Sequence, residues 1–388
     1  MHRVGCTAAL NLAWFRAHSE MTMVRIDTLL YQGKSAWWIR VLLFPLTLLS
    51  LLYGALVRTR TLSYSLGLTG KKRLPCPVIS VGNITVGGTG KTPLVMALAR
   101  KLKEKGISVA ILSRGYKGKK AGGRWVGDGS GVFLSPEDAG DEPFLMADSL
   151  KDIPVLVGKD RFAGGRMALQ KLELDGFLLD DGYQHLQLYR DLDILLVDSQ
   201  TGFGNGRLLP RGILREPLSH VRRAQVFLLT KVEAPESCRS LEQRLRKIHP
   251  SAAIFHSHYE PVGWKGPGNE REGLHHLRGK KALALSGIGG PGHFSALLRM
   301  CGIEIVDEAV FPDHHLYTGK DLASVEKRMK EAEYVLTTEK DLVRLKRLPI
   351  GHLPIRALRI EMRIWEEEEF YRRVLEIFPT VGKNRILG

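Results

Sequence analysis

Cysteine is scarce in this chain, and the few cysteines that occur are far apart. The 388 residues include four cysteines, Cys6, Cys76, Cys238 and Cys301, and no two of them form a C-x-x-C pair. Such spacing argues against a disulfide framework and against a cysteine-ligated zinc site. It fits a protein of a reducing compartment.

Aromatic residues are also few, at 7% of the chain, while the net charge is strongly positive at +16. A basic balance of this size predicts an anionic partner: nucleic acid, anionic lipid or a phosphorylated substrate. A membrane-tethered nucleic-acid binder would need aromatic side chains interleaved with the basic ones, which the composition does not favour. Hydrophobic content of 44% and charged content of 25% are ordinary, and the length allows two domains.

Charge is missing from one long stretch near the N-terminus. Between Arg40 and Arg58 the sequence reads VLLFPLTLLSLLYGALV. As a helix this stretch would extend about 26 Å, slightly short of a hydrocarbon core of roughly 30 Å. Adding residues 37–39 makes a crossing feasible, whereas Pro45 leaves a hairpin or an interfacial helix open, and a buried core helix is the alternative.

We therefore predict a membrane-anchoring helix over 37–60, after an N-terminal extension, 1–36, whose first 22 or so residues we assign no function. Arg58, Arg60 and the run 71–73 follow the apolar stretch. By the positive-inside rule, these basic residues place the bulk of the chain on the cytoplasmic side of a membrane.

The most informative stretch is VISVGNITVGGTGKT, at residues 78–92. Its apolar, β-branched start predicts a strand, its glycines predict a loop, and apolar residues at helical spacing over 94–102 predict a helix. Such a loop turns backbone N–H groups toward a polyphosphate, and the helix N-terminus adds its positive dipole end. Lys91 is expected to reach the β- and γ-phosphates, and the Thr92 hydroxyl to ligate Mg²⁺.

One position departs from the common pattern G-x-x-x-x-G-K-[ST], because Thr85 stands where the first glycine is usual. A plain glycine-rich turn before a helix is the alternative interpretation of the loop. The predicted phosphate-binding residues are Thr85, Gly87, Gly88, Thr89, Gly90, Lys91 and Thr92.

Strands alternate with helices along the rest of the chain, which predicts an α/β fold of the P-loop NTPase type with a mostly parallel sheet. We expect a P-loop domain over 70–259, a linker over 260–279 and a smaller α/β domain over 280–388. The Gly/Lys-rich stretch 117–131 is predicted to be a long loop. The predicted strands are 109–112, 155–157, 177–179, 194–197, 226–229, 282–285, 303–306, 334–337 and 358–362.

Acidic residues stand where a second anchor for Mg²⁺ is expected. Asp180 and Asp181 end an apolar strand, as the metal-binding acid of P-loop enzymes does, although aspartate is common in strand-end turns anyway. Asp141 and Glu142 follow Gly140; they could cap a helix, or Asp141 could act as a general base.

Basic residues near these acids could bind phosphate. Arg161 and Arg215 could clamp phosphate groups bidentately or form surface salt bridges. His314 follows Asp313 after a predicted strand, and such a contact is usually structural and sometimes catalytic. Two further motifs are weak: the G-x-G-x-x-G match at 287–292 contains a proline, and Thr-Lys-Val-Glu at 230–233 only faintly resembles a guanine-reading segment.

Taken together, the motifs resemble those of the membrane-bound tetraacyldisaccharide 4′-kinases of Gram-negative bacteria, which act in the lipid A pathway. The resemblance runs from about Trp37 to near the C-terminus, and Thr85 is normal in this family. The motifs that carry it are 81–92, Ser113-Arg114-Gly115-Tyr116, Gly140-Asp141-Glu142-Pro143, Asp160-Arg161, Leu179-Asp180-Asp181-Gly182 with Gln184-His185, Leu214-Arg215-Glu216-Pro217, Asp313-His314 and Thr338-Glu339-Lys340-Asp341.

The resemblance implies an ATP-dependent lipid kinase that phosphorylates the 4′-hydroxyl of an acylated glucosamine disaccharide 1-phosphate, with ATP and Mg²⁺. It implies a monomer at the bacterial inner membrane, with the catalytic domains on the cytoplasmic side and no nucleic acid as partner. A membrane-associated P-loop ATPase or GTPase that acts as a switch is the alternative.

The resemblance also implies roles for individual residues. Asp141 would be the catalytic base, with His314 in a dyad and Lys91 steadying charge. The metal would be held by Thr92, Asp180, Asp181 and Glu142, and the substrate or its phosphate would be contacted by Arg161, Arg215, Tyr116 and His185.

Overall fold

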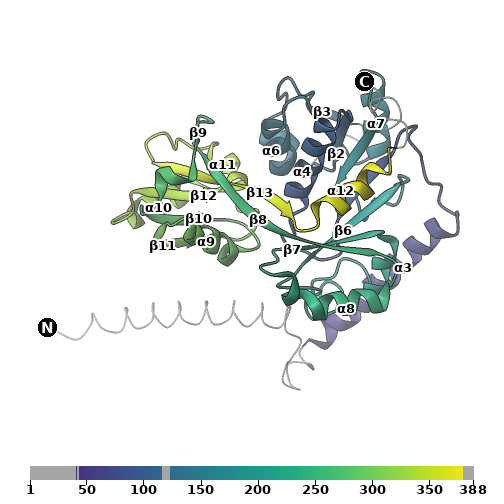
Figure 1. The fold of residues 1–388 in the computed structure, drawn as a ribbon. Helices are drawn as coiled ribbons and strands as arrows, with labels where there is room; N and C mark the ends of the chain where they lie inside the picture. Colours follow the sequence, from purple (N-terminus) through teal and green to yellow (C-terminus); the bar gives the residue numbers. More distant parts are fainter. Residues whose placement is uncertain (1–40, 42, 116–122, 379–388) are drawn as a thin grey trace.

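The computed structural model describes residues 41, 43–115 and 123–378, and these form two lobes joined by a pair of long strands (Figure 1). One sheet of 13 strands runs through both lobes, in the order β11-β10-β12-β13-β8-β7-β6-β1-β5-β2-β4-β3, with β9 beside β8. Most neighbouring strands are parallel; the antiparallel pairs are β3 with β4, β8 with β9 and β8 with β13. A mixed α/β fold with a mostly parallel sheet is thereby confirmed.

The first lobe contains β1 to β7 and the helices around them. Its central strands are buried along their whole length, as expected where helices cover both faces of a parallel sheet. Its strands are β1 (Val78–Gly82), β2 (Val109–Ser113), β3 (Arg124–Gly127), β4 (Val155–Val157), β5 (Gly176–Asp180), β6 (Leu192–Asp198) and β7 (Val226–Thr230). Its helices are α3 (Phe44–Ser65), α4 (Lys91–Glu104), α5 (Pro136–Ala139), α6 (Asp141–Ser149), α7 (Arg161–Leu169) and α8 (Arg239–Ile248), with 3₁₀ turns η1 (Leu218–Arg223) and η2 (Pro235–Cys238).

The second lobe is smaller. Its strands are β9 (Arg271–Glu272), β10 (Lys281–Ser286), β11 (Glu304–Val310) and β12 (Tyr334–Thr338), and its helices are η3 (Leu274–Leu277), α9 (Pro291–Met300), α10 (Gly319–Arg328) and α11 (Glu339–Leu345). Helix α10 begins with a capping box between Thr318 and Asp321, which satisfies N–H groups at its first turn.

Two long strands, β8 (Ala253–Lys265) and β13 (Ile355–Ile364), connect the lobes and form what we call the ribbon. The start of β8 pairs in parallel with β7, and its remainder pairs antiparallel with β13. The linker predicted over 260–279 is therefore wrong. Its first residues belong to β8, and the elements β9 and η3 come after them. Its Gly, Pro and charged residues are typical of a linker. The first of them form a strand here because β13, nearly 100 residues later in the chain, pairs with them.

The end of the chain returns to the first lobe. Helix α12 (Glu367–Leu375) packs there, with the Phe370 ring edge-on to Phe255 of β8 at 5.3 Å between centroids and Glu367 paired with Lys101 of α4 at 3.0 Å. Residues 280–378 thus contribute to both lobes (Figure 1). The long loop predicted over 117–131 is also interrupted, because 124–127 form β3; residues 116–122 lie outside the described residues.

Helix α3 carries most of the apolar stretch predicted to reach a membrane; residues 37–40 and 42 of that segment lie outside the described residues. Pro45 lies in its first turn, where a missing N–H breaks no helical hydrogen bond. Within the ranges given above, no helix combines the length and hydropathy needed for a transmembrane span. One side of α3 nevertheless exposes large apolar side chains: Phe44, Leu48, Leu49, Leu51, Leu52, Leu56 and Leu62.

Candidate active site

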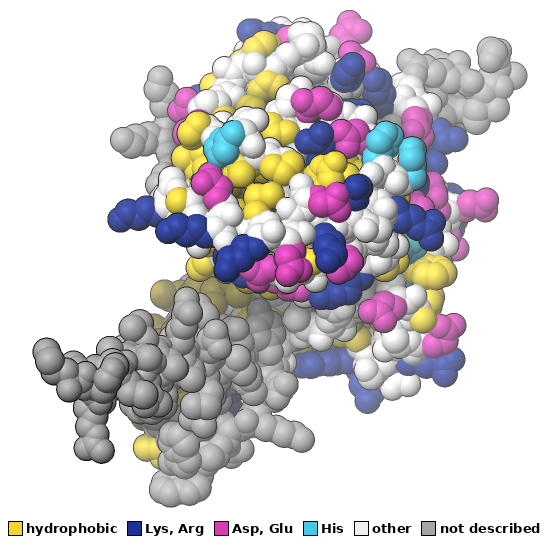
Figure 2. Space-filling model, turned by 90° about the vertical axis from the view of Figure 1, so that its left-hand side faces the viewer, with side chains coloured by type: hydrophobic (Ala, Val, Ile, Leu, Met, Phe, Trp, Pro, Cys, Tyr) yellow, Lys and Arg dark blue, Asp and Glu magenta, His cyan; other side chains and the backbone are white. Residues whose placement is uncertain are grey.

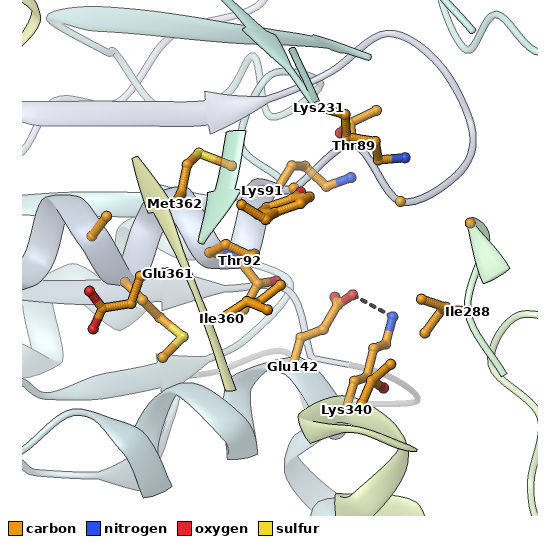
Figure 3. A pocket seen from close by; sticks show the side chains of 18 of the residues that line it. Thr89, Lys91, Thr92, Glu142, Lys231, Ile288, Lys340, Ile360, Glu361 and Met362 are labelled. Carbon is orange, nitrogen blue, oxygen red and sulfur yellow. Dashed lines mark hydrogen bonds and ion pairs between the residues drawn. The ribbon is translucent and has the colours of Figure 1, made fainter. Parts of the chain in front are cut away.

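The glycine loop forms the floor of a cavity of about 680 Å³ between the two lobes (Figure 3). The loop follows β1, and α4 begins at Lys91 directly after Gly90. Gly87 and Gly90 adopt φ of 110° and 89°, a left-handed conformation that other residues rarely adopt. All seven predicted phosphate-binding residues line the cavity, so the strand, loop and helix predicted from this motif are confirmed.

The ribbon packs directly on this loop. A Cβ atom at Gly90 would collide with the Tyr259 hydroxyl and lie 2.9 Å from the Met362 methyl group. Tyr259 and Met362 are register partners in β8 and β13. The absence of a side chain at Gly90 therefore lets the connection between the lobes touch the start of α4.

Asn83 is a buried centre that holds the loop and its charged neighbours together. Its amide nitrogen donates to the Thr85 carbonyl at 2.8 Å, which closes the turn in which Thr85 replaces glycine. Its side-chain oxygen accepts from Lys91 Nζ at 3.3 Å and from Arg215 Nη1 at 3.2 Å. The Gln184 amide donates to the Asn83 carbonyl at 2.9 Å. A single amide side chain thus sets the positions of both cations.

Asp180 and Asp181 are neighbours in sequence with opposite environments. Burial alone would raise the pKa of Asp181, but Lys91 and Arg215 outweigh it and lower that pKa to about 2. Arg215 donates to both oxygens of Asp181, at 2.8 and 3.1 Å, in the fork geometry typical of a strong pair. Asp181 is thereby a charged partner of the phosphate-loop cations.

Asp180 lies at the buried end of β5. Burial, then the charges of Glu142 and Asp181, raise its pKa to about 7. Ser113 donates to one carboxyl oxygen at 3.0 Å, and the other, Oδ1, is buried without a hydrogen-bond partner. A buried carboxyl oxygen without a hydrogen-bond partner is unusual in a folded protein, which distinguishes Asp180 from Asp181.

Glu142 faces the cavity from the start of α6, opposite Lys340 at the start of α11 (Figure 3). Lys340 Nζ donates to Glu142 at 2.8 Å. Burial would raise the pKa of Glu142, but Lys340 and Lys91 outweigh burial and lower it. Over the described ranges, no three His, Cys, Asp or Glu side chains gather closely enough to hold a metal ion by themselves.

Asp141 belongs to a charged cluster between the lobes. It is the first residue of α6, whose N-cap is Gly140 without a side-chain cap bond, so it does not serve as the helix cap. Arg344 and Arg347 donate to its two oxygens at 2.7 and 3.0 Å. The Arg344 side chain is fully buried, and its Nη2 also lies 3.3 Å from His314 Nδ1. Arg344 therefore brings the two predicted dyad residues to one guanidinium group.

Two other predicted substrate contacts, Arg161 and His185, lie away from the cavity. Arg161 and His185 do not line it, and each has a buried side-chain nitrogen, Nε of Arg161 and Nε2 of His185, without a partner. Burial and Arg114 lower the pKa of Arg161 to about 10, while burial and Arg161 lower the pKa of His185 to about 4. Tyr116 lies outside the described residues.

The second lobe closes over the phosphate loop with the segment 287–290. A Cβ atom at Gly289 would lie 3.2 Å from the Gly88 amide nitrogen and 3.4 Å from Asp313 Oδ2. The glycines of the G-x-G-x-x-G match therefore permit close approach to the phosphate loop. Lys231, in the Thr-Lys-Val-Glu segment, is bound to Asp198 at 2.5 Å and lines a second cavity of about 300 Å³ beside the loop.

Four residues that organise this site were not assigned a role from the sequence: Asn83, Tyr259, Lys340 and Arg344. Asn83 and Lys340 lie inside motifs that carry the family resemblance, so the motifs themselves were the signal. Tyr259 lies at the boundary of the predicted linker, and Arg344 lies in the short helix α11. No local pattern distinguishes them, because their partners come from distant segments.

A parallel sheet whose first strand enters a glycine loop and a helix, with an acid at the end of the adjacent strand, defines a P-loop nucleotide-binding protein. The match extends to one family, since the model for tetraacyldisaccharide-1-P 4′-kinase aligns with residues 41–379. The chain belongs to this family.

Relatives of known name agree. The chain is 43% identical to the tetraacyldisaccharide 4′-kinase of Syntrophus aciditrophicus, over 86% of this chain and 92% of that protein. It is 42% identical to the kinase of the same name from Geobacter sulfurreducens, over 80% and 87%. The solved structure of LpxK from Aquifex aeolicus in complex with ATP is 36% identical, with a TM-score of 0.69 and coverage of 88% of this chain and 99% of that chain. The resemblance drawn from the motifs is thereby confirmed.

Proposed function

We propose that this protein transfers the γ-phosphate of ATP to the 4′-hydroxyl of a tetraacyldisaccharide 1-phosphate, a lipid A precursor. The observation that carries the proposal is the family match along nearly the whole described chain, in a chain whose phosphate loop, Lys91 and Thr92 line one cavity. The solved relative named LpxK has ATP bound, which supports ATP as the phosphate donor.

On the donor side, the loop amides and Lys91 bind the β- and γ-phosphates. Asn83 and Asp181 hold Lys91 and Arg215 in place, at 3.3 and 3.2 Å from Asn83 Oδ1. Because contacts with Asn83 and Asp181 fix these cations, little rearrangement is needed as charge develops on the transferred phosphoryl group. Catalysis of this kind depends mostly on position and charge stabilisation.

The donor set also fits Mg²⁺, which prefers oxygen ligands. Asp180 has a buried oxygen without a partner, while Asp181 is bound by Arg215 and Glu142 by Lys340. Thr92 and Asp180 would therefore hold the ion, with Glu142 and Asp181 around them. When bound, Mg²⁺ neutralises phosphate charge and orients the γ-phosphate. Because no three such side chains gather in the described ranges, the nucleotide phosphates would complete the coordination.

On the acceptor side, Asp141 accepts the proton of the 4′-hydroxyl, as a general base within hydrogen-bond reach would. Arg344 and Arg347 occupy one position on each Asp141 oxygen, and a carboxylate oxygen has a second lone pair for the substrate hydroxyl. His314 supports Asp141 through the shared Arg344 guanidinium. Contacts of the disaccharide or its 1-phosphate with Arg161, His185 and Tyr116 stay a prediction from the family resemblance, since Arg161 and His185 do not line the cavity.

The acceptor is a lipid, and α3 is the element that meets its membrane. Its exposed leucines and Phe44 present an apolar face, and basic residues follow at Arg58, Arg60 and Lys71. An apolar face beside basic residues suits an anionic lipid surface. We place the protein at the cytoplasmic side of the bacterial inner membrane, as a monomer.

A nucleic-acid partner is not part of this proposal. Figure 2 views the molecule from the side of the second lobe, where acidic and basic side chains are mixed around an apolar centre. Proteins that bind along a nucleic-acid backbone have basic side chains clustered on one surface. On this face, the net positive charge is not gathered in that way.

The test is transfer of radiolabelled phosphate from ATP to the purified disaccharide 1-phosphate lipid in detergent. Lipid-dependent labelling supports the kinase, whereas nucleotide hydrolysis without lipid labelling would support the alternative switch ATPase. Asp141→Asn should reduce transfer by about two orders of magnitude or more while ATP still binds. Near-normal transfer by this variant would remove Asp141 from the role of base.

A further inference from the structure

The segment 207–215 binds the phosphate loop edge to edge. Val86 N donates to the Ile213 carbonyl at 2.9 Å, and Arg215 N donates to the Ile84 carbonyl at 2.7 Å. Thr85 and Leu214 form an antiparallel bridge between these bonds. The backbone at Arg215 is therefore hydrogen-bonded on both sides of Thr85 to the first half of the phosphate loop.

Helix α3 is seated on the same segment. Ser50 Oγ donates to the Leu208 carbonyl at 2.8 Å and accepts from Arg211 N at 3.0 Å. Gly54 lets the two come close, because a Cβ atom there would lie 2.6 Å from the Leu208 side chain. Ser50 and Gly54 are the buried residues of the helix, so this contact is where α3 joins the lobe.

The contact reaches Arg215 itself. Tyr53 Oη donates to the Arg215 carbonyl at 2.8 Å. Arg215 is thus fixed at three points: its carbonyl by Tyr53, its amide by Ile84, and its guanidinium by Asp181 and Asn83. The first of these anchors comes from the helix that exposes an apolar face.

A second, weaker contact follows the same route. Arg60 Nη2, farther along α3, donates to the Gln184 carbonyl at 3.2 Å. The Gln184 side chain in turn donates to the Asn83 carbonyl. Helix α3 therefore touches both segments that converge on Asn83, the residue that binds Lys91.

We propose that Tyr53 is a positioning residue for Arg215, through which α3 orders the phosphate-binding groups as well as facing the lipid surface. The inference rests on the proposed kinase function. Loss of the hydroxyl would free the carbonyl end of Arg215 and let its guanidinium drift, and drift of about 1 Å can reduce catalysis strongly. The contact of α3 with the segment 207–215 would therefore also determine the position of Arg215 at the phosphate loop.

The test compares Tyr53→Phe with Tyr64→Phe in the full chain. Tyr64 lies on the same helix, and its hydroxyl makes no hydrogen bond within the described ranges, so it is a matched control. Tyr53→Phe should lower kcat for lipid phosphorylation about 5- to 10-fold, as loss of one hydrogen bond predicts. The KM for lipid and binding to phosphatidylglycerol vesicles should equal those of Tyr64→Phe, and the thermal midpoint should be lower by no more than loss of one hydrogen bond predicts.

A second arm tests the route through Arg215. Arg215→Lys will lower kcat by itself. When Tyr53→Phe is added to Arg215→Lys, kcat should fall by less than a further 2-fold, because the group that Tyr53 positions is already altered. Equal kcat for Tyr53→Phe and Tyr64→Phe, or full additivity with Arg215→Lys, would overturn the inference. If the wild-type protein labels no lipid, the kinase proposal fails instead, and the two failures are distinguished.

Discussion

The two walls of the central cavity are built in different ways. The wall of the first lobe is built mainly on one continuous stretch, the phosphate loop and the start of α4, to which Glu142, Asp181 and Arg215 add single side chains. The wall of the second lobe joins short pieces at 288–290, Asp313–His314 and 338–340. Behind this wall, Arg344 contacts His314 and Asp141 of the first lobe. The first wall is a local motif that binds phosphate, and the second is a tertiary assembly that positions the acceptor chemistry.

The largest expected effect lies on the contiguous wall. Lys91→Ala should lower phosphate transfer by about 10³-fold or more, because no other side chain supplies positive charge from within the loop. The measurement is steady-state labelling of the lipid. Lys103→Ala is the control on the same helix, since Lys103 does not line the cavity and donates instead to Lys151 and Asp152. Equal losses in both variants would contradict the assignment.

Substitution of Asp180 should strongly lower activity and at the same time raise stability. Asp180→Asn should reduce transfer about 100-fold, because the unpaired carboxyl oxygen is lost. Burial raises the pKa of Asp180 from 3.8 to about 7. The stability that its neutral form provides is complete below about pH 4 and is lost as pH rises through about 7. Asparagine is neutral at every pH, so the Asp180→Asn variant loses none of this stability as pH rises.

The metal-free Asp180→Asn protein should therefore unfold at a higher temperature than the wild type at about pH 8, and the difference should shrink toward pH 5. Thermal melts across this range measure it. Asp181→Asn is the matched comparison: with burial outweighed by Lys91 and Arg215, the pKa of Asp181 is lowered to about 2. Its charged form stabilises the fold above about pH 4, so this variant should be less stable. A pH-independent difference for Asp180→Asn would speak against the raised pKa.

Arg344 tests the assembled wall. Arg344→Met should lower the free energy of unfolding by about 3–5 kcal/mol, because Asp341 and Asp141 lose a buried partner. The kcat should fall at least about 10-fold as Asp141 and His314 lose their common contact. Urea unfolding and lipid labelling measure the two effects. Arg347→Met, which removes a more exposed contact to Asp141, should have a clearly smaller effect on both.

The smallest effect is expected where the two walls touch. Gly289→Ala would place a Cβ atom 3.2 Å from the Gly88 amide, so the loop must shift by a few tenths of an ångström. The KM for ATP should rise about 3-fold with little change in kcat. Gly319→Ala, at an open position of the same lobe, should leave both unchanged. If Gly289→Ala also leaves KM unchanged, contact between the walls does not influence nucleotide binding.

Much of the first lobe could be predicted from the sequence. The strands β1, β2, β4, β5, β6 and β7 lie where short apolar runs predict them, since each run is buried on both faces. The ribbon could not be predicted in the same way. Strand β8 mixes His258, Glu260 and Pro261 with buried residues, and the partner that makes it a strand, β13, comes almost 100 residues later.

The candidate site divides in the same manner. The phosphate loop, Thr92 and the Asp180–Asp181 pair follow from local pattern, because glycine freedom, helix start and strand end are properties of neighbouring residues. Which of the two aspartates is held charged by cations, and that Arg344 joins Asp141 to His314, depend on groups from distant segments.

By itself, the sequence determined the phosphate loop, the positions of most strands and the family, because each of these is encoded in contiguous residues. Only the tertiary structure decided the roles of Asn83, Tyr53 and Arg344, and the contrasting charge states of two adjacent carboxyls. Burial and electrostatic fields depend on which distant side chains meet, and no local spacing encodes such meetings.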